Sequence, residues 1–251
     1  MARKKDDGLI LQGDVYARNR QIDGAGSVLI GNTTKLELKS ESEKKERISK
    51  QRDTFGQALD SLTSPKPVAI NFDLDTFDRY NLVMALMGKD RDLTRDAADI
   101  TDEAVVIGKR GQWFRVANDY WDESKEITLK TASGDVVDKA LYEINPRLGM
   151  IKIADNSSTI KDGDTVALSY SIMDKNKFQI DAGGLTSFDL ELIVDGKNRI
   201  TGEDVRLEIP SAVISADAAI DWFGDDFVTA SFSGVLVTVD GKAPYSLIAN
   251  D

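Results

Sequence analysis

Thr34-Lys35-Leu36-Glu37-Leu38-Lys39-Ser40-Glu41-Ser42-Glu43 is the stretch from which the fold is best predicted, because every odd position in it is charged. The even positions are Thr, Leu, Leu, Ser and Ser. Alternate residues of a β-strand point to opposite faces. We therefore predict a strand with one solvated face and one packed face that becomes small and polar toward its end. The polar residues 44–52 are then either a solvated loop or a strand whose packing partner lies on another chain.

Most of the remaining chain is also predicted to form strands, in segments rich in Val, Ile, Leu, Thr, Tyr and Phe between turn residues. These segments are Pro67–Leu74, Ala104–Ile107, Ile127–Thr131, Leu141–Ile144, Met150–Ala154, Thr165–Ile172, Phe188–Val194, Val205–Ile209 and Phe227–Val239. Asp-Gly pairs at 23–24, 162–163, 195–196 and 240–241 favour tight turns, because glycine adopts positive φ without steric cost. The predicted fold is mainly β, a sandwich or barrel.

One helix is predicted over about residues 75–87. The apolar residues that recur there at helical spacing are Phe77, Tyr80, Met84 and Met87. Asp75 or Thr76 is expected to cap the N-terminus, with Asp78 adding a negative charge in the first turn, and Gly88 to end the helix. A weaker helix is predicted over residues 216–223.

The composition excludes several function classes. The 251 residues contain no histidine and no cysteine, which removes disulfides, cysteine nucleophiles, zinc fingers and Ser-His-Asp triads. There is no phosphate-binding P-loop and no complete dinucleotide fingerprint. With 41% hydrophobic residues the chain can bury a core, and no apolar run reaches the ~18 residues of a membrane span. We expect no enzyme, no cofactor, no secretion signal and no membrane partner.

Charge is distributed unevenly along the chain. Residues 1–52 carry 12 Lys/Arg and 8 Asp/Glu (net +4), whereas residues 181–251 carry 4 and 13 (net −9). The total of −11 disfavours tight binding of nucleic acid through its phosphates. A basic N-terminal region and an acidic C-terminal region could attract one another on neighbouring copies, or could both be solvated surface.

Two clusters of acidic residues are candidate metal sites. Asp73 and Asp75 fall on one face of a strand, with Asp78 nearby, but a polar strand end that runs into a helix cap is favoured. Asp162-Gly163-Asp164 lacks the full EF-hand spacing. Glu41 and Glu43 share a face, as paired glycosidase carboxylates do, yet they lie among lysines and arginines and are interpreted as solvated surface.

The order of several segments resembles the tail tube proteins, or major tail proteins, of long-tailed bacteriophages. The residues that carry the resemblance are Gly8–Tyr16, Gly31–Lys39, the charged segment to Arg52, Asn71–Gly88, Asp102–Val105, Tyr142–Ile153, Asp195–Asn198 and the closing strand through Pro244-Tyr245. The likeness covers nearly the whole chain, although each short pattern is common. The resemblance implies a tail-tube-like β-barrel or sandwich with a β-rich insertion. Residues 1–95 and 183–251 would form the tube domain and residues 96–182 the insertion.

In function, the resemblance implies a structural virion protein, assembled in the host cytoplasm and located in the tail. Its subunits would form rings, usually hexameric, that stack into a hollow tube. Its partners would be further copies of itself, the tape measure protein, the tail terminator and distal tail or baseplate proteins. Double-stranded DNA would pass through the tube without specific binding, because an acidic channel repels phosphate.

A long hairpin or loop that touches the next subunit or ring is implied near residues 41–63. The candidate contact residues are Glu41, Glu43, Lys44, Lys45, Glu46, Arg47, Lys50 and Arg52. Lys35, Glu37 and Lys39 are candidate channel-facing or solvent-facing strand charges.

Three alternatives stay open at this point. The first is a monomeric carbohydrate-binding or adhesion β-sandwich, for which Trp113, Trp121 and Trp222 are the aromatic residues to examine. The second is an enzyme with paired carboxylates such as Asp73 and Asp75. The third is another ring-forming tail component, such as a terminator or a baseplate ring.

Overall fold

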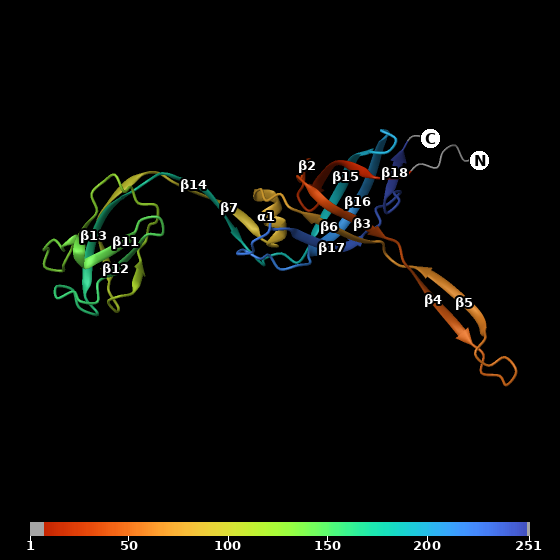
Figure 1. Ribbon diagram of the computed structural model, residues 1–251, viewed down its shortest axis with the longest axis horizontal. Helices are drawn as coiled ribbons and strands as arrows, with labels where there is room; N and C mark the ends of the chain where they lie inside the picture. The colour runs from red at the N-terminus through yellow and green to blue at the C-terminus, as the bar shows by residue number, and fades with distance from the viewer. Residues whose placement is uncertain (1–7, 250–251) are drawn as a thin grey trace. The chain divides into compact units, whose positions relative to one another are not determined.

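The computed structural model describes residues 8–249 (Figure 1). The chain divides into two compact units, each with its own hydrophobic core. Unit 1 runs to Asp90 and resumes at Ile180, and unit 2 is the segment Arg91–Gln179 between them. The sequence-based boundaries lay after residues 95 and 182. In the structure the chain passes from one unit to the other within β7 (Lys89–Arg95) and again within β14 (Lys175–Asp181). These two strands pair with each other as a two-stranded ribbon.

Unit 1 is built on one antiparallel sheet, and its strands come from both ends of the sequence. They are β1 (Leu11–Asn19), β2 (Val28–Leu29), β3 (Thr33–Lys39), β6 (Ala69–Leu74), β15 (Phe188–Asn198), β16 (Asp204–Ala216), β17 (Ala230–Leu236) and β18 (Ser246–Ala249). Their order is β2-β1-β15-β16-β17-β6-β3, with β18 pairing to β16. The prediction of a mainly β fold with one α-helix is confirmed. The described sheet is open rather than a closed barrel, and β2 and β3 are its edges.

The strand predicted over Thr34–Glu43 is present as β3 (Thr33–Lys39) but is shorter than predicted. In β3, Leu36 and Leu38 pack against the core while Lys35, Glu37 and Lys39 are exposed, so the alternation is confirmed. The prediction that the strand continues to Glu43 is wrong. β3 pairs with β6, whose first residue Ala69 lies opposite Lys39, so the chain leaves the sheet there.

One Asp-Gly pair was also misassigned. Gly24, Gly163 and Gly241 have positive φ and lie in turns, as predicted. Asp195 and Gly196 instead lie within β15, paired on one side with β1 and on the other with β16. Two ladders of backbone hydrogen bonds outweigh the local preference of this pair for a turn.

The helix α1 is shorter than predicted, Arg79–Ala85, and its cap is different. Asp78 is the N-cap: its Oδ1 accepts a hydrogen bond from the Asn81 amide at 2.7 Å. The predicted caps are occupied elsewhere, because the Thr76 hydroxyl accepts from the Asn32 amide at 2.9 Å and Asp75 accepts from the Asn32 side chain at 2.8 Å. A capping carboxylate three residues before the amide it binds is the usual geometry.

The helix ends at Ala85, with Leu86 as its C-cap, and the chain turns away over Met87 and Gly88. Met87 itself adopts the left-handed conformation with φ 48°. A Cβ on Gly88 would lie 2.7 Å from Ile180 Cγ2, so the glycine permits close packing against Ile180 of β14. Met84, a residue of the helix, is buried, and its side chain packs in the unit 1 core.

The weaker helix predicted over residues 216–223 does not form. β16 extends through Ala216, where Ser215 and Ala216 pair with Ser233 and Phe232 of β17. Residues 217–229 that follow are neither helix nor strand. Strand pairing outweighs the helix preference at Ala216, which leaves the remaining residues without the first turn of the predicted helix. The sheet core includes Phe72 and Phe232, whose stacked rings lie 4.8 Å apart.

Unit 2 contains two three-stranded antiparallel sheets with orders β10-β13-β8 and β11-β12-β9. Their strands are β8 (Ala98–Val106), β9 (Trp113–Arg115), β10 (Thr128–Lys130), β11 (Tyr142–Asn145), β12 (Met150–Ile153) and β13 (Thr165–Ile172), with a 3-10 turn η1 (Lys139–Leu141). Both sheets contribute to one core. At its centre Trp121 packs on Tyr170, with ring centroids 4.6 Å apart.

Candidate assembly surface

The most exposed regular structure in unit 1 is the hairpin of β4 (Ser42–Ile48) and β5 (Ala58–Pro65) (Figure 1). Within the described residues these strands pair only with each other, and every residue in both is exposed. The Lys66 amide donates to the Glu41 carbonyl at 2.9 Å and closes the base of the hairpin. An isolated two-stranded hairpin is marginally stable in water. Packing against a partner would therefore stabilise this hairpin.

The charged residues predicted as contacts lie on this hairpin, and most form ion pairs within it. Lys44 pairs with Glu46, Lys45 lies 3.8 Å from Glu43, and Arg47 lies 2.6 Å from Asp60. Glu41 pairs with Lys39 at 2.6 Å, and Arg52 lies 3.6 Å from its neighbour Asp53. Such exposed pairs contribute little to stability. Their effect is to leave a nearly neutral surface that a second copy can approach without strong repulsion.

The loop of the hairpin is held by specific hydrogen bonds around Ser49. The Ser49 amide donates to Gln57 at 2.8 Å, and its buried hydroxyl lies 2.7 Å from the Thr54 hydroxyl. Phe55 is carried by this loop with 73% of its surface exposed. Lys50 is also exposed there. The charges of this segment were predicted from the sequence, but its exposed apolar residue Phe55 was not.

The apolar side chains of the strands were missed as well. Ile48, Leu59 and Leu62 are exposed, with Leu62 at 64%. Leu62 lies directly opposite Lys45 across the hairpin. Their signal in the sequence is weak, because single apolar residues separated by polar ones do not produce a continuous hydrophobic face.

The edge strand β3 leads directly into this hairpin. Its exposed charges are paired along the strand, with Lys35 3.0 Å from Glu37. The hydrogen bond of Lys35 to Glu37, with the charge of that carboxylate, raises the pKa of the lysine, and contact with Glu41 acts in the same way on Lys39. The outer edge of β3 has no strand partner among residues 8–249, and an open edge can pair with another chain.

A second exposed surface lies at one end of the unit 1 sheet, where both ends of the described chain meet. Leu11 pairs with Asn198, and the next strands in order bring Val205 opposite Ala249. The Arg199 amide donates to the Ile10 carbonyl at 2.8 Å. The large apolar residues exposed in these segments are Leu9, Ile10, Leu11, Ile200, Leu247 and Ile248. Contiguous exposed apolar surface marks an interaction site more often than scattered residues do.

Residues 217–229 add a third surface that combines aromatic and acidic side chains. Phe223 and Phe227 are each 96% exposed and Trp222 is 60% exposed. Four aspartates and no lysine or arginine lie in this segment. Ile220 alone among its large apolar residues packs against the unit 1 core.

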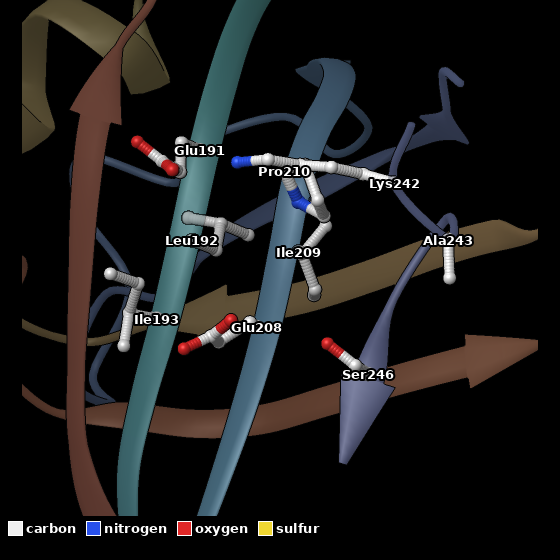
Figure 2. Close-up of a pocket in the computed structure, with 9 residues that line it drawn as sticks. All are labelled: Glu191, Leu192, Ile193, Glu208, Ile209, Pro210, Lys242, Ala243 and Ser246. Atoms are coloured by element: carbon white, nitrogen blue, oxygen red, sulfur yellow. The ribbon is translucent and has the colours of Figure 1, made fainter. Parts of the chain in front are cut away.

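A shallow hollow of about 420 Å³ occurs where β16 changes partner (Figure 2). The second edge of β16 pairs with β18 up to Glu208 and with β17 from Ala212, and Pro210, which has no amide hydrogen, lies between. Figure 2 shows the Lys242 side chain reaching across Pro210. The two carboxylates of the hollow already have cationic partners: Glu191 with Arg18 at 2.5 Å and Glu208 with Arg206 at 3.0 Å.

Most of the carboxylates considered for metal binding, though not Asp73, accept hydrogen bonds from nearby protein groups. Asp75 and Asp78 accept the hydrogen bonds described above. Asp162 accepts from the amide and Nε of Arg110, at 3.0 and 2.9 Å, and these bonds lower the pKa of its carboxyl. Within residues 8–249 no group of three or more acidic, histidine or cysteine side chains could hold a metal ion.

The fold and these surfaces define a mainly β protein whose exposed hairpin, sheet edges and apolar sheet end are available for association. The chain belongs to the family described as "Protein of unknown function UCP028589", whose model matches residues 9–245. No curated protein matches the sequence. None of the helices described between residues 8 and 249 is long and apolar enough to cross a membrane.

Proposed function

We propose that the protein is a tail tube subunit of a long-tailed bacteriophage, which assembles with copies of itself into stacked rings. The observation that carries the proposal is the β4–β5 hairpin, an ordered ribbon in which every strand residue is exposed. Together with the sheet edge at β3, it offers a subunit two means of contacting a neighbour. The resemblance in segment order supports the tube rather than another kind of assembly.

The energetics favour an assembly that uses several surfaces together. Full burial of a fully exposed large apolar side chain contributes about 1.5–3 kcal/mol. Phe55, Leu59 and Leu62 are 45–73% exposed, so burying the rest of their surface supplies roughly 3–5 kcal/mol in total. Association costs an estimated 4–15 kcal/mol in lost freedom. The hairpin alone is therefore marginal. Strand pairing at the sheet edge and burial of the apolar sheet end would supply the remainder.

The proposed tube carries double-stranded DNA, and its other partners would be the tape measure protein, the tail terminator and distal tail or baseplate proteins. The net charge of −11 per chain supports passage without binding, because six copies bring about six times that charge into one ring. A terminator or a baseplate ring is the related alternative. The number of copies in purified virions separates these roles, because a tube subunit is present in many rings and the others in few.

Negative-stain electron microscopy at rising protein concentration, together with sedimentation velocity, tests the proposal. Rings or hollow tubes are the expected result. A chain that stays monomeric and is absent from virions at high copy number would overturn it. A monomeric glycan-binding sandwich would then take its place. Of the three tryptophans, Trp121 is 1% exposed and unavailable to a ligand, which leaves Trp113 and Trp222 for that alternative.

A further inference from the structure

Unit 2 contains a hollow of about 480 Å³ in which positive charge is concentrated. Four cationic side chains line it, Arg115, Arg147, Lys175 and Lys177, against the single carboxylate of Asp119. Unit 2 as a whole is acidic: residues 91–179 contain 13 Lys/Arg and 16 Asp/Glu, a net charge of −3. The positive hollow is therefore a local feature and does not follow from the overall composition.

Asp119 is already neutralised by residues on its own side of the hollow. Its Oδ2 accepts from Lys175 Nζ at 2.8 Å, and its Oδ1 lies 3.2 Å from Arg95 Nη1. Burial opposes ionisation of this carboxyl, but the hydrogen bond and charge of Lys175, with Arg95, outweigh it and lower its pKa. Arg115, Arg147 and Lys177 form no ion pair with any residue that the structure describes. Three positive charges thus remain uncompensated.

Two of these cations, Arg115 and Arg147, lie on closely packed backbone. Gly149, in the β11–β12 turn beside Arg147, has φ 63°, and a Cβ there would lie 2.1 Å from the Asn118 carbonyl oxygen. The turn is therefore packed backbone to backbone against the segment that carries Asp119 and Tyr120. Arg115 lies directly opposite Met150 in the β9–β12 pair.

Tyr120, which lines the hollow, has an unfavourable backbone conformation. It adopts φ 52°, a left-handed conformation that bulky residues rarely take and that is concentrated at functional sites. Lys175 and Lys177 lie over its ring, with their Nζ atoms 5.1 and 5.8 Å from the centroid. Leu148 and Phe178, both exposed by more than two fifths, add an apolar rim.

We propose that this hollow binds an acidic saccharide, a sugar unit that carries a carboxylate, sulfate or phosphate group. The two arginine forks suit planar, bidentate recognition of such an oxyanion. The carbon face of the sugar ring packs on the aromatic and aliphatic rim, as ligands commonly do in concave sites with a few convergent polar groups. The proposal is independent of ring assembly.

The charge distribution argues for a compact ligand rather than nucleic acid. Binding along a nucleic acid depends on neutralising many phosphates in succession. Only three uncompensated cations are present in the hollow, and the unit around it is net negative. An extended duplex would meet repulsion beyond the hollow, whereas one or two acidic sugar units would not.

Isothermal titration calorimetry on the full-length protein tests this inference. The probes are tri-galacturonic acid, a heparin-derived tetrasaccharide and a sugar phosphate, which distinguish carboxylate, sulfate and phosphate. Neutral galactotriose, inorganic phosphate, hexaglutamate and a short DNA duplex are the comparison ligands. Binding of at least one acidic sugar, tighter than that of every comparison ligand, is expected.

Arg147→Gln and Lys177→Gln should each weaken that binding by about tenfold, the usual effect of losing one charge-assisted hydrogen bond. Lys161→Gln, which removes an exposed lysine elsewhere in unit 2, should leave it unchanged. Thermal melting establishes that the variants are folded, and because both target side chains are exposed we expect no change in Tm. Absence of binding by all acidic sugars, equal binding of hexaglutamate, phosphate or DNA, or equal loss in Lys161→Gln would each overturn the proposal.

Discussion

Gly13 lies directly opposite Gly196 where β1 pairs with β15, and a Cβ on Gly13 would lie 2.1 Å from the Asp195 carbonyl oxygen. The φ of Gly13 is not in the left-handed region, so the glycine is required by space and not by backbone conformation. The two strands approach one another there more closely than any side chain would permit.

Gly13→Ala should therefore destabilise the protein, by roughly 1–3 kcal/mol, the usual cost of forcing extra volume into a packed site. The free energy of unfolding from urea denaturation measures the effect. Gly26→Ala is the matched control, because a Cβ there has no neighbour within 4 Å and its φ is not positive. That variant should be unchanged or slightly more stable. Equal losses in both variants would contradict the close approach of β1 and β15.

Met84 anchors helix α1 to the unit 1 core, where it is 1% exposed. Met84→Ala should lower the free energy of unfolding by about 2–5 kcal/mol through lost burial and the cavity that remains. Val83→Ala, next to it on the helix, should cost clearly less, because Val83 is only half-buried. Denaturation of the two variants under the same conditions compares them, and a larger loss for Val83→Ala would show that the helix packs in another orientation.

The hairpin should govern assembly without governing the stability of the monomer. Replacing both Phe55 and Leu62 with serine should reduce ring or tube formation at least about tenfold, since each loses more than 1 kcal/mol of burial on association. The monomer should keep its Tm, because both side chains are exposed. Val136→Ser, at an equally exposed apolar residue of unit 2, is the control and should assemble normally.

Charge reversal at Lys44, Lys45 and Arg47 tests the electrostatic part of the same surface. The triple change to glutamate breaks ion pairs within the hairpin and leaves uncompensated negative charge on it. Assembly should weaken at low salt and partly recover as salt screens the repulsion. Sedimentation velocity across a salt series measures this. Normal tubes together with native circular dichroism would place the interface elsewhere.

Tyr170 should make unit 2 sensitive to alkaline pH. Burial of its hydroxyl, with the hydrogen bond it donates to Glu103, raises the pKa of Tyr170 from 10.0 to about 12. Between these values the unfolded chain releases the proton first, so the stabilisation is complete below pH 10 and is lost as pH rises toward 12. Its size is of order 2 kcal/mol.

The difference in stability between the wild type and Tyr170→Phe, measured from pH 8 to 12, isolates this contribution from other titrating groups. We expect the difference to change only above pH 10. A difference that stays constant from pH 8 to 12 would mean that the pKa of Tyr170 is the same in the folded and unfolded chain, and that its contact with Glu103 is absent in solution.

Local patterns predicted many of the strands, but β1, β7, β9 and β14 were not among the predicted segments. The alternation around Leu36 and Leu38 is a property of neighbouring residues, and Thr165–Ile172 was predicted with the bounds of β13. The turn expected at Asp195-Gly196 did not form, because partners distant in the chain decide that backbone conformation, and the helix expected after Ser215 lost its first residue, Ala216, to pairing with β17. Sheet pairing of this kind has no local signal.

The candidate surfaces likewise combine features that the local sequence predicts with features that depend on the tertiary fold. A charged segment after Lys39 was evident from its composition, whereas its hairpin geometry and the exposure of Phe55 depend on pairing between β4 and β5. The cations of the unit 2 hollow are separated by up to 62 positions, from Arg115 to Lys177, and follow no period. Only the fold brings them together, through a turn whose tight packing at Gly149 is itself a tertiary property.

The pairing of β1 with β15 also determines when unit 1 can become complete during synthesis. Asn19 can pair with Leu190 only after another 171 residues have emerged from the ribosome. Residues 91–179, which form a contiguous unit, can fold in that interval. Contacts this distant in the chain form slowly. The sheet edge at β3, which joins the sheet through β6 and β17, thus reaches its final arrangement only late in translation, which delays strand pairing with another chain at that edge. The β4–β5 hairpin, whose described strands pair only with each other, can form much earlier.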